Sequence, residues 1–118
     1  MRSLIIAATA AVIFLSQGSL GVAGFNSGSE LLDMCAATQS DGAYHAKIAE
    51  CRGYVTGVAD AFNCESPSKG YRWQDPGATM GQLVKVVVKW LNENPDKLHC
   101  GAGSLTAAAL SEAFPCQP

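Results

Sequence analysis

The sequence predicts an all-α fold, a small four-helix bundle-like domain stapled by disulfides. Apolar residues recur with the 3.6-residue period of a helix in two long stretches of the chain. Two motifs of the form S/T-x-x-E/Q, which cap helix N-termini, precede apolar runs. The chain has 118 residues and five cysteines. A domain of this size buries a limited core, so disulfides are a favoured means of stabilising it.

Residues 1–24 have the pattern of a cleaved secretory signal peptide. Arg2 precedes an apolar run, Leu4–Leu15, and small and polar residues follow up to Gly24. The apolar run is shorter than the roughly 20 residues that span a bilayer. We therefore expect cleavage near Gly24 and a mature domain of residues 25–118, with an uncleaved membrane anchor as the alternative.

The charge balance argues against a nucleic-acid partner. The whole chain has a formal net charge of −2. Loss of residues 1–24 removes Arg2 and no acidic residue, which leaves 7 basic and 10 acidic residues, a net charge of −3. There is no basic patch of the kind that binds phosphates. We expect neither nucleic acid nor, after cleavage, a membrane as a partner.

Two helices are expected in the first half of the mature chain. The capping-box motif Ser27-Gly28-Ser29-Glu30 precedes a short helix that ends near Cys35. After polar, turn-forming residues, a second helix runs from about Tyr44 to Phe62. Its apolar stripe consists of Ile48, Cys51, Val55, Val58, Ala59 and Phe62.

Gly53 and Gly57 lie one turn apart on a neighbouring face of this second helix. Each glycine costs about 1 kcal/mol relative to alanine inside a helix. The pair therefore predicts that another helix backbone approaches closely at this face.

The segment from Cys64 to Ala78 is rich in turn-forming residues but also contains Tyr71, Arg72 and Trp73 in succession. Aromatic residues beside an arginine are typical of interface hot spots. Two interpretations stay open at this point. Trp73 either folds back as a lid on the core or anchors a partner together with its two neighbours.

Two further helices complete the fold. Thr79-Met80-Gly81-Gln82 is a second capping-box motif, and it begins the strongest helical stripe of the chain, which Asn94-Pro95 ends. This stripe consists of Met80, Leu83, Val84, Val87, Val88 and Leu91. We expect a loop over 95–103 and an alanine-rich fourth helix from about Ser104 to Phe114.

Antiparallel helix pairs reduce the 15 possible two-bridge patterns of five cysteines to one. Cys35 and Cys51 lie at equal distances from the turn between the first two helices, so they face each other. The end of the fourth helix returns to the start of the third, which brings Cys116 near Cys64. Cys100 lies at the other end of the fourth helix, about 16 Å away, beyond the reach of a disulfide. We expect Cys35–Cys51, Cys64–Cys116 and an unpaired Cys100.

Residue types that carry out catalysis are sparse. His45 and His99 are the only histidines, and His99-Cys100 has no second pair at metal-ligand spacing. A Cys–His nucleophile at Cys100 is conceivable, but an unpaired exported cysteine is more often buried or capped. Arg52 and Asp60 lie in the central helix, for which a core role is favoured over a catalytic one. We expect no enzyme, no metal site and no cofactor.

Several segments, in a fixed order over nearly the whole mature chain, carry a family resemblance. They are LLDMC (31–35), CRGYVTGVAD (51–60), TMGQLVKVVVKWL (79–91), Asn94-Pro95, Leu98-His99 and AFPC (113–116). With them the chain resembles the Rap/Tai family of immunity proteins, small periplasmic antagonists of type VI secretion amidase effectors. The family usually has a cysteine about where Trp73 stands; here Cys64 lies earlier in a longer loop, and Cys100 is extra.

The resemblance implies an all-helical fold, frequent homodimers and inhibition of a peptidoglycan amidase by blocking its substrate cleft in the periplasm. An inhibitor of this kind needs a rigid body and one protruding segment, because rigidity limits the entropy lost on binding. We expect the Glu65–Ala78 loop, with Tyr71, Arg72 and Trp73, to be that segment.

Two other functions stay open. A small periplasmic acid-stress chaperone would expose apolar surface and dissociate at low pH as its acids become protonated. Another envelope binding module is the third class. Capture of unfolded clients by a dissociated dimer would indicate the chaperone, and a nanomolar complex with one cell-wall amidase would indicate the immunity protein.

Overall fold

The computed structural model describes residues 26–67 and 70–118, so the predicted signal peptide lies outside the described residues. The described chain forms α1 (Gly28–Cys35), α2 (Tyr44–Ala61), α3 (Met80–Glu93), the 3-10 turn η1 (Pro95–Lys97) and α4 (Ala102–Ala113). The all-α fold expected from the sequence is confirmed. Within the described ranges, no helix is both long and apolar enough to cross a membrane.

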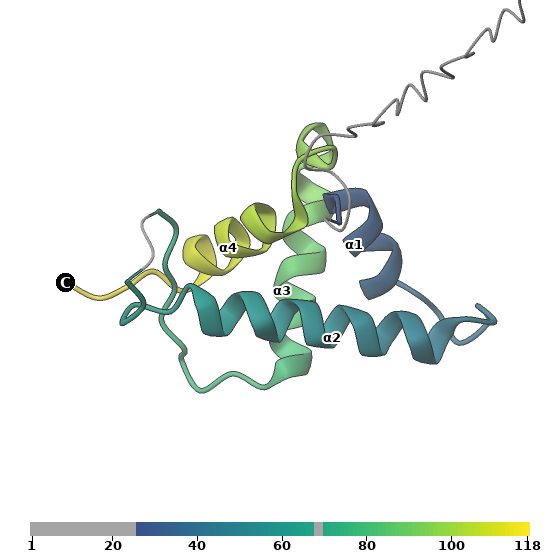
Figure 1. The fold of residues 1–118 in the computed structure, drawn as a ribbon, viewed down its shortest axis with the longest axis horizontal. Helices are drawn as coiled ribbons and strands as arrows, with labels where there is room; N and C mark the ends of the chain where they lie inside the picture. Colours follow the sequence, from purple (N-terminus) through teal and green to yellow (C-terminus); the bar gives the residue numbers. More distant parts are fainter. Residues whose placement is uncertain (1–25, 68–69) are drawn as a thin grey trace, which may run out of the picture.

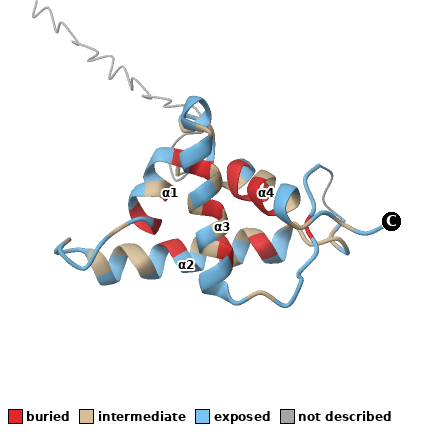
Figure 2. Ribbon diagram, turned by 180° about the vertical axis from the view of Figure 1, so that it is seen from behind, coloured by how far each residue is buried: buried red, intermediate tan, exposed pale blue. Residues whose placement is uncertain are grey.

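The longest helix, α2, forms one side of the domain, and the other helices pack against it (Figure 1). α1 packs mainly against α2, and α4 packs mainly against α3. α3 crosses α2 instead of running alongside it (Figure 1). Buried residues lie where the four helices meet, while the outer side of α2 is exposed (Figure 2). The two predicted stripes supply much of this core through Val55, Val87 and Leu91. Met80, the first residue of the α3 stripe, is exposed instead.

The predicted helix starts agree with the observed caps to different degrees. The capping box of α3 is complete: Thr79 Oγ1 accepts from the Gln82 N–H, and Gln82 Oε1 accepts from the Thr79 N–H. At α1 only half of the capping box forms. Ser27 Oγ accepts from the Glu30 N–H, but the Glu30 side chain accepts from the Ser27 hydroxyl and not from the Ser27 backbone. α4 begins at Ala102, two residues before the predicted start.

The first turn of α1 is seated against the segment before α4. The N–H of Gly28 donates to the Cys100 carbonyl over 2.9 Å, and the N–H of Ser29 donates to the Leu98 carbonyl over 3.0 Å. In return, the N–H of Ala102 donates to the Asn26 carbonyl over 2.8 Å. These bonds satisfy donors that helix starts leave unpaired, and they explain the early start of α4.

The expectation for Gly53 and Gly57 is wrong. Both are exposed, and a methyl group added at either would meet nothing within 4 Å. The close approach occurs at Gly28, where an added Cβ would lie 2.5 Å from Leu105 Cδ1 and 3.1 Å from the Leu98 backbone. The glycine at a helix–backbone contact therefore lies in α1 and not in α2.

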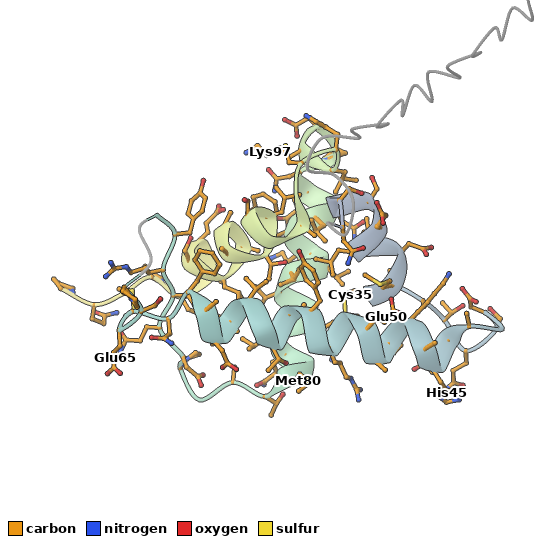
Figure 3. All side chains as sticks on the ribbon, viewed as in Figure 1. Cys35, His45, Glu50, Glu65, Met80 and Lys97 are labelled. Atoms are coloured by element: carbon orange, nitrogen blue, oxygen red, sulfur yellow. A yellow bond between two sulfur atoms is a disulfide. The ribbon has the colours of Figure 1, made fainter. Side chains whose placement is uncertain are left out.

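Both expected disulfides are present. Cys35–Cys51 joins α1 to α2 across a Cα–Cα distance of 5.1 Å, and Figure 3 shows Cys35 against α2. Cys64–Cys116 joins the end of α2 to the segment after α4 across 5.8 Å. Cys100 is a free thiol, as predicted.

An ion-pair cluster fixes the turn between α1 and α2. The Lys47 ammonium lies 2.7 Å from Asp41 Oδ2 and 3.1 Å from Asp33 Oδ2. Asp41 Oδ1 also accepts from the Ala43 N–H over 2.8 Å, at a helix start that has no side-chain cap. The hydrogen bond from Lys47, followed by that from Ala43, lowers the pKa of Asp41, and the two carboxylates raise the pKa of Lys47.

Candidate protein-binding site

Trp73 anchors the segment between α2 and α3 to the body of the protein. Its side chain is 5% exposed, and its indole N–H donates to the Ala59 carbonyl of α2 over 2.7 Å. Its backbone N–H donates to the Phe62 carbonyl, and its carbonyl accepts from the Cys64 N–H, each over 3.0 Å. Trp73 is thus a lid on the core, the first of the two interpretations from the sequence.

Residues 114–118, called the tail, complete the same anchorage. The Phe114 ring lies 6.2 Å from the Trp73 ring, centroid to centroid, at a tilt of 56°. The N–H of Gln74 donates to the Phe114 carbonyl over 2.8 Å, and the N–H of Gln117 donates to Gln74 Oε1 over 3.0 Å. The Cys64–Cys116 disulfide closes the cluster covalently. Figure 1 shows this cluster at the end of the domain opposite α1.

Residues 70–78, called the arm, project from this anchorage and lead into α3. Gly70 and Gly77 have φ values of 106° and 88°, a region that favours glycine. Asp75 Oδ1 accepts from the N–H groups of Gly77 and Ala78 over 2.8 and 3.1 Å, which fixes the turn before α3. The backbone of the arm is therefore held at Trp73 and Gln74 and at the turn before α3.

Tyr71 is the large hydrophobic side chain of the arm that faces solvent, with 55% of its surface exposed. Arg72 is also exposed, and its Nη1 lies 3.5 Å from the Cys64 carbonyl oxygen, at the long limit of a hydrogen bond. The three residues singled out in the sequence thus divide into two groups: Tyr71 and Arg72 face solvent, whereas Trp73 faces the core. Partner binding by Tyr71 and Arg72 stays a prediction.

The residues considered for catalysis do not assemble. His45 lies at the end of α2 opposite Glu65 (Figure 3). His99 Nε2 lies 3.7 Å from the Cys100 thiol, beside an open cavity of about 620 Å³ that Tyr54, Phe62 and the first turn of α4 also line. Burial raises the pKa of Tyr54, although a hydrogen bond from the Gly103 backbone acts against the shift. Over residues 26–67 and 70–118, no three His, Cys, Asp or Glu side chains come together as metal ligands.

The contacts between the tail and the arm were not predicted from the sequence. Two of these contacts use the backbone carbonyl of Phe114 and the backbone N–H of Gln117, groups that leave no signature in residue type. The only available signal was the predicted Cys64–Cys116 bridge, which already placed the tail beside the start of the arm.

Together, the stapled body and the exposed arm define a small helical domain whose geometry suits contact with another protein. The family model of the Rap1a immunity proteins matches residues 27–116, about three-quarters of the chain. The chain belongs to this family, and its partner class is therefore a protein effector. Comparisons with curated proteins and with solved structures give no match.

Proposed function

We propose that this immunity protein binds a secreted peptidoglycan amidase effector in the periplasm and blocks its substrate cleft. The observation that carries the proposal is the exposed Tyr71 side chain, two residues from the buried Trp73 that anchors its backbone. An aromatic residue beside an arginine is the composition that binding hot spots favour. A segment of this kind can enter a cleft.

The anchorage of the arm at Trp73, Gln74 and the Asp75 turn supports tight binding. A segment that is already ordered loses less conformational entropy when it binds than a free loop does. The disulfide, the Trp73 hydrogen bonds and the Asp75 turn supply this order before any partner arrives. In this proposal the chain acts by occlusion and carries out no chemical step of its own.

The periplasmic location rests on two independent features of the sequence. Residues 1–24 have the pattern of a signal peptide. Four of the five cysteines form disulfides, which persist in oxidising compartments and are rare in the cytosol. Peptidoglycan amidases act in the same compartment.

The chaperone alternative has less support from the surface. A holdase needs a broad apolar surface to bind unfolded clients. Among the described residues, the exposed large hydrophobic side chains are Tyr71 and Met80. Two such side chains suit a specific contact better than general capture.

The test is inhibition of a peptidoglycan amidase effector from the same organism by the mature protein, with Tyr71→Ala and Arg72→Ala as variants. We expect the wild type to inhibit with nanomolar affinity and each variant to bind about 30-fold more weakly, equivalent to about 2 kcal/mol. Glu50→Ala is the matched control, because Glu50 lies on α2 away from the arm (Figure 3). Full inhibition by both variants would remove the arm from the site, and a wild type that inhibits no such amidase would refute the proposal.

A further inference from the structure

The two disulfides lie in different surroundings. Cys51 is fully buried and Cys35 is 8% exposed, so their bond lies within the core between α1 and α2. Cys64 and Cys116 are both partly exposed and lie at the surface beside the arm. Thiol–disulfide exchange requires the attacking thiolate to reach a sulfur atom. A reductant in solution therefore reaches the second bond more readily than the first.

The exposed bond also holds the arm. Three hydrogen bonds join the arm to the segments that carry the disulfide. The Cys64 N–H donates to the Trp73 carbonyl, the Gln74 N–H donates to the Phe114 carbonyl, and the Gln117 N–H donates to Gln74 Oε1. Cys64 Sγ itself lies 3.1 Å from the Trp73 carbonyl oxygen, as a contact, since a disulfide sulfur carries no hydrogen. Opening the bond removes the covalent link between the two segments that make these contacts.

The core does not depend on this bond in the same way. Leu31, Val55, Val87 and Leu91 are fully buried at the junction of α1, α2 and α3, and Cys35–Cys51 lies among them. Loss of the exposed bond therefore leaves the apolar junction and its own disulfide in place.

We propose that Cys64–Cys116 is a redox-sensitive switch for the arm, separate from the structural bond Cys35–Cys51. A dithiol reductant transfers two electrons and two protons to the bond, giving two cysteine thiols and an oxidised cyclic disulfide of the reductant. The tail then separates from Gln74, and the part of the arm next to Cys64 and the tail loses its hydrogen-bonded order, while the helices, the indole hydrogen bond of Trp73 and the Asp75 turn remain. The link to effector binding rests on the proposed function; the change in the arm does not.

The first experiment uses the mature wild-type protein alone. Stepwise titration with dithiothreitol, followed by alkylation and peptide mass mapping, should label Cys64 and Cys116 at least ten-fold faster than Cys35 and Cys51. At the stage where only the exposed bond is open, hydrogen exchange at the Cys64, Trp73, Gln74 and Gln117 amides should accelerate at least ten-fold. Amides of Val87 and Leu91 in α3 serve as the internal control and should not change. Simultaneous opening of both bonds, or unchanged exchange in the arm, would overturn the switch.

The second experiment uses variants in a Cys100→Ser background, which prevents the free thiol from forming new bonds. Cys64→Ser with Cys116→Ser should keep the helical circular dichroism and lose at least ten-fold in affinity for the amidase. Cys35→Ala with Cys51→Ala is the matched control. Compared with the first variant, it should lower the melting temperature more and should reduce the affinity of the folded fraction less. Full affinity of the first variant would overturn the link between the bond and binding. If the wild type binds no amidase, the proposed function fails, and the exchange experiment still decides whether the bond controls the arm.

Discussion

The indole N–H of Trp73 donates a 2.7 Å hydrogen bond to the backbone carbonyl of Ala59, near the end of α2. Ala59 belongs to the apolar stripe of α2, so this bond ties the segment after α2 to the same helix whose core face it covers. The exposed Tyr71 of the arm therefore lies only two residues from a buried residue that is bonded to α2.

Trp73→Ala should destabilise the protein strongly. Truncating a buried tryptophan costs about 3–5 kcal/mol, because it removes apolar contacts and leaves a cavity. Tyr71→Ala, at an exposed position, should change the free energy of unfolding by less than about 0.5 kcal/mol. Urea unfolding of the two variants measures both values. Similar stability for both variants would contradict the lid role of Trp73.

Gly28→Ala and Gly53→Ala should have opposite effects. A Cβ at Gly28 would lie 3.1 Å from backbone atoms of Leu98, so the backbone must shift, at a cost of about 1–3 kcal/mol. Gly53 has nothing within 4 Å, so alanine there should stabilise α2 by up to about 1 kcal/mol. Thermal unfolding compares the pair directly, and a stabilising Gly28→Ala would show that α1 is not seated against Leu98.

Asp41→Asn should reduce stability at neutral pH but not in strong acid. The pKa of Asp41 in the folded protein is lowered below its usual value of 3.8 by Lys47 and Ala43. Its contribution is therefore fully present above a pH of about 4 and is lost as the pH falls through the folded-state pKa. Melting temperatures of the variant and the wild type should differ at pH 7 and converge once the pH has fallen below the lowered pKa of Asp41. Glu50→Gln is the control, and a difference that persists in acid would contradict the ionic role of Asp41.

Thr106→Val should leave stability unchanged or raise it by about 1 kcal/mol. Thr106 is fully buried in α4, and its Oγ1 has no hydrogen-bond partner. Valine keeps the shape and removes the cost of a buried unpaired hydroxyl. Thr56→Val, at a half-buried position of α2, is the matched control. Chemical denaturation decides the point, and a loss above 1 kcal/mol would indicate that the hydroxyl has a partner.

Sequence periodicity was sufficient where the structure depends on spacing along one element. Cys51, Val55 and Ala59 form the core face of α2, and Leu83, Val87 and Leu91 form that of α3, because a helical period places such residues on one side. Ile48 and Val58 of the predicted α2 stripe are only partly buried and lie outside this core. The disulfide pairing followed for the same reason, since helix length fixes where Cys35 and Cys116 lie along their hairpins.

Contacts between distant segments could not be predicted in this way. Gly53 and Gly57 have the spacing of a close helix contact, but spacing does not say which element faces them. Gly28 meets Leu98, about 70 residues later in the chain, through backbone atoms that any residue carries, and it also faces the side chain of Leu105. The orientation of Trp73 was undecided for the same reason, because its partner is the carbonyl of Ala59.

The Cys64–Cys116 bond closes a ring of chain that contains the arm, α3, η1 and α4. A protease that cleaves the exposed arm after Arg72 therefore cuts the ring once, and both fragments stay joined by the sulfur bridge. The nicked protein would migrate as a single species in a non-reducing gel and as two fragments after reduction. Cleavage within this exposed segment thus leaves the molecule in one piece.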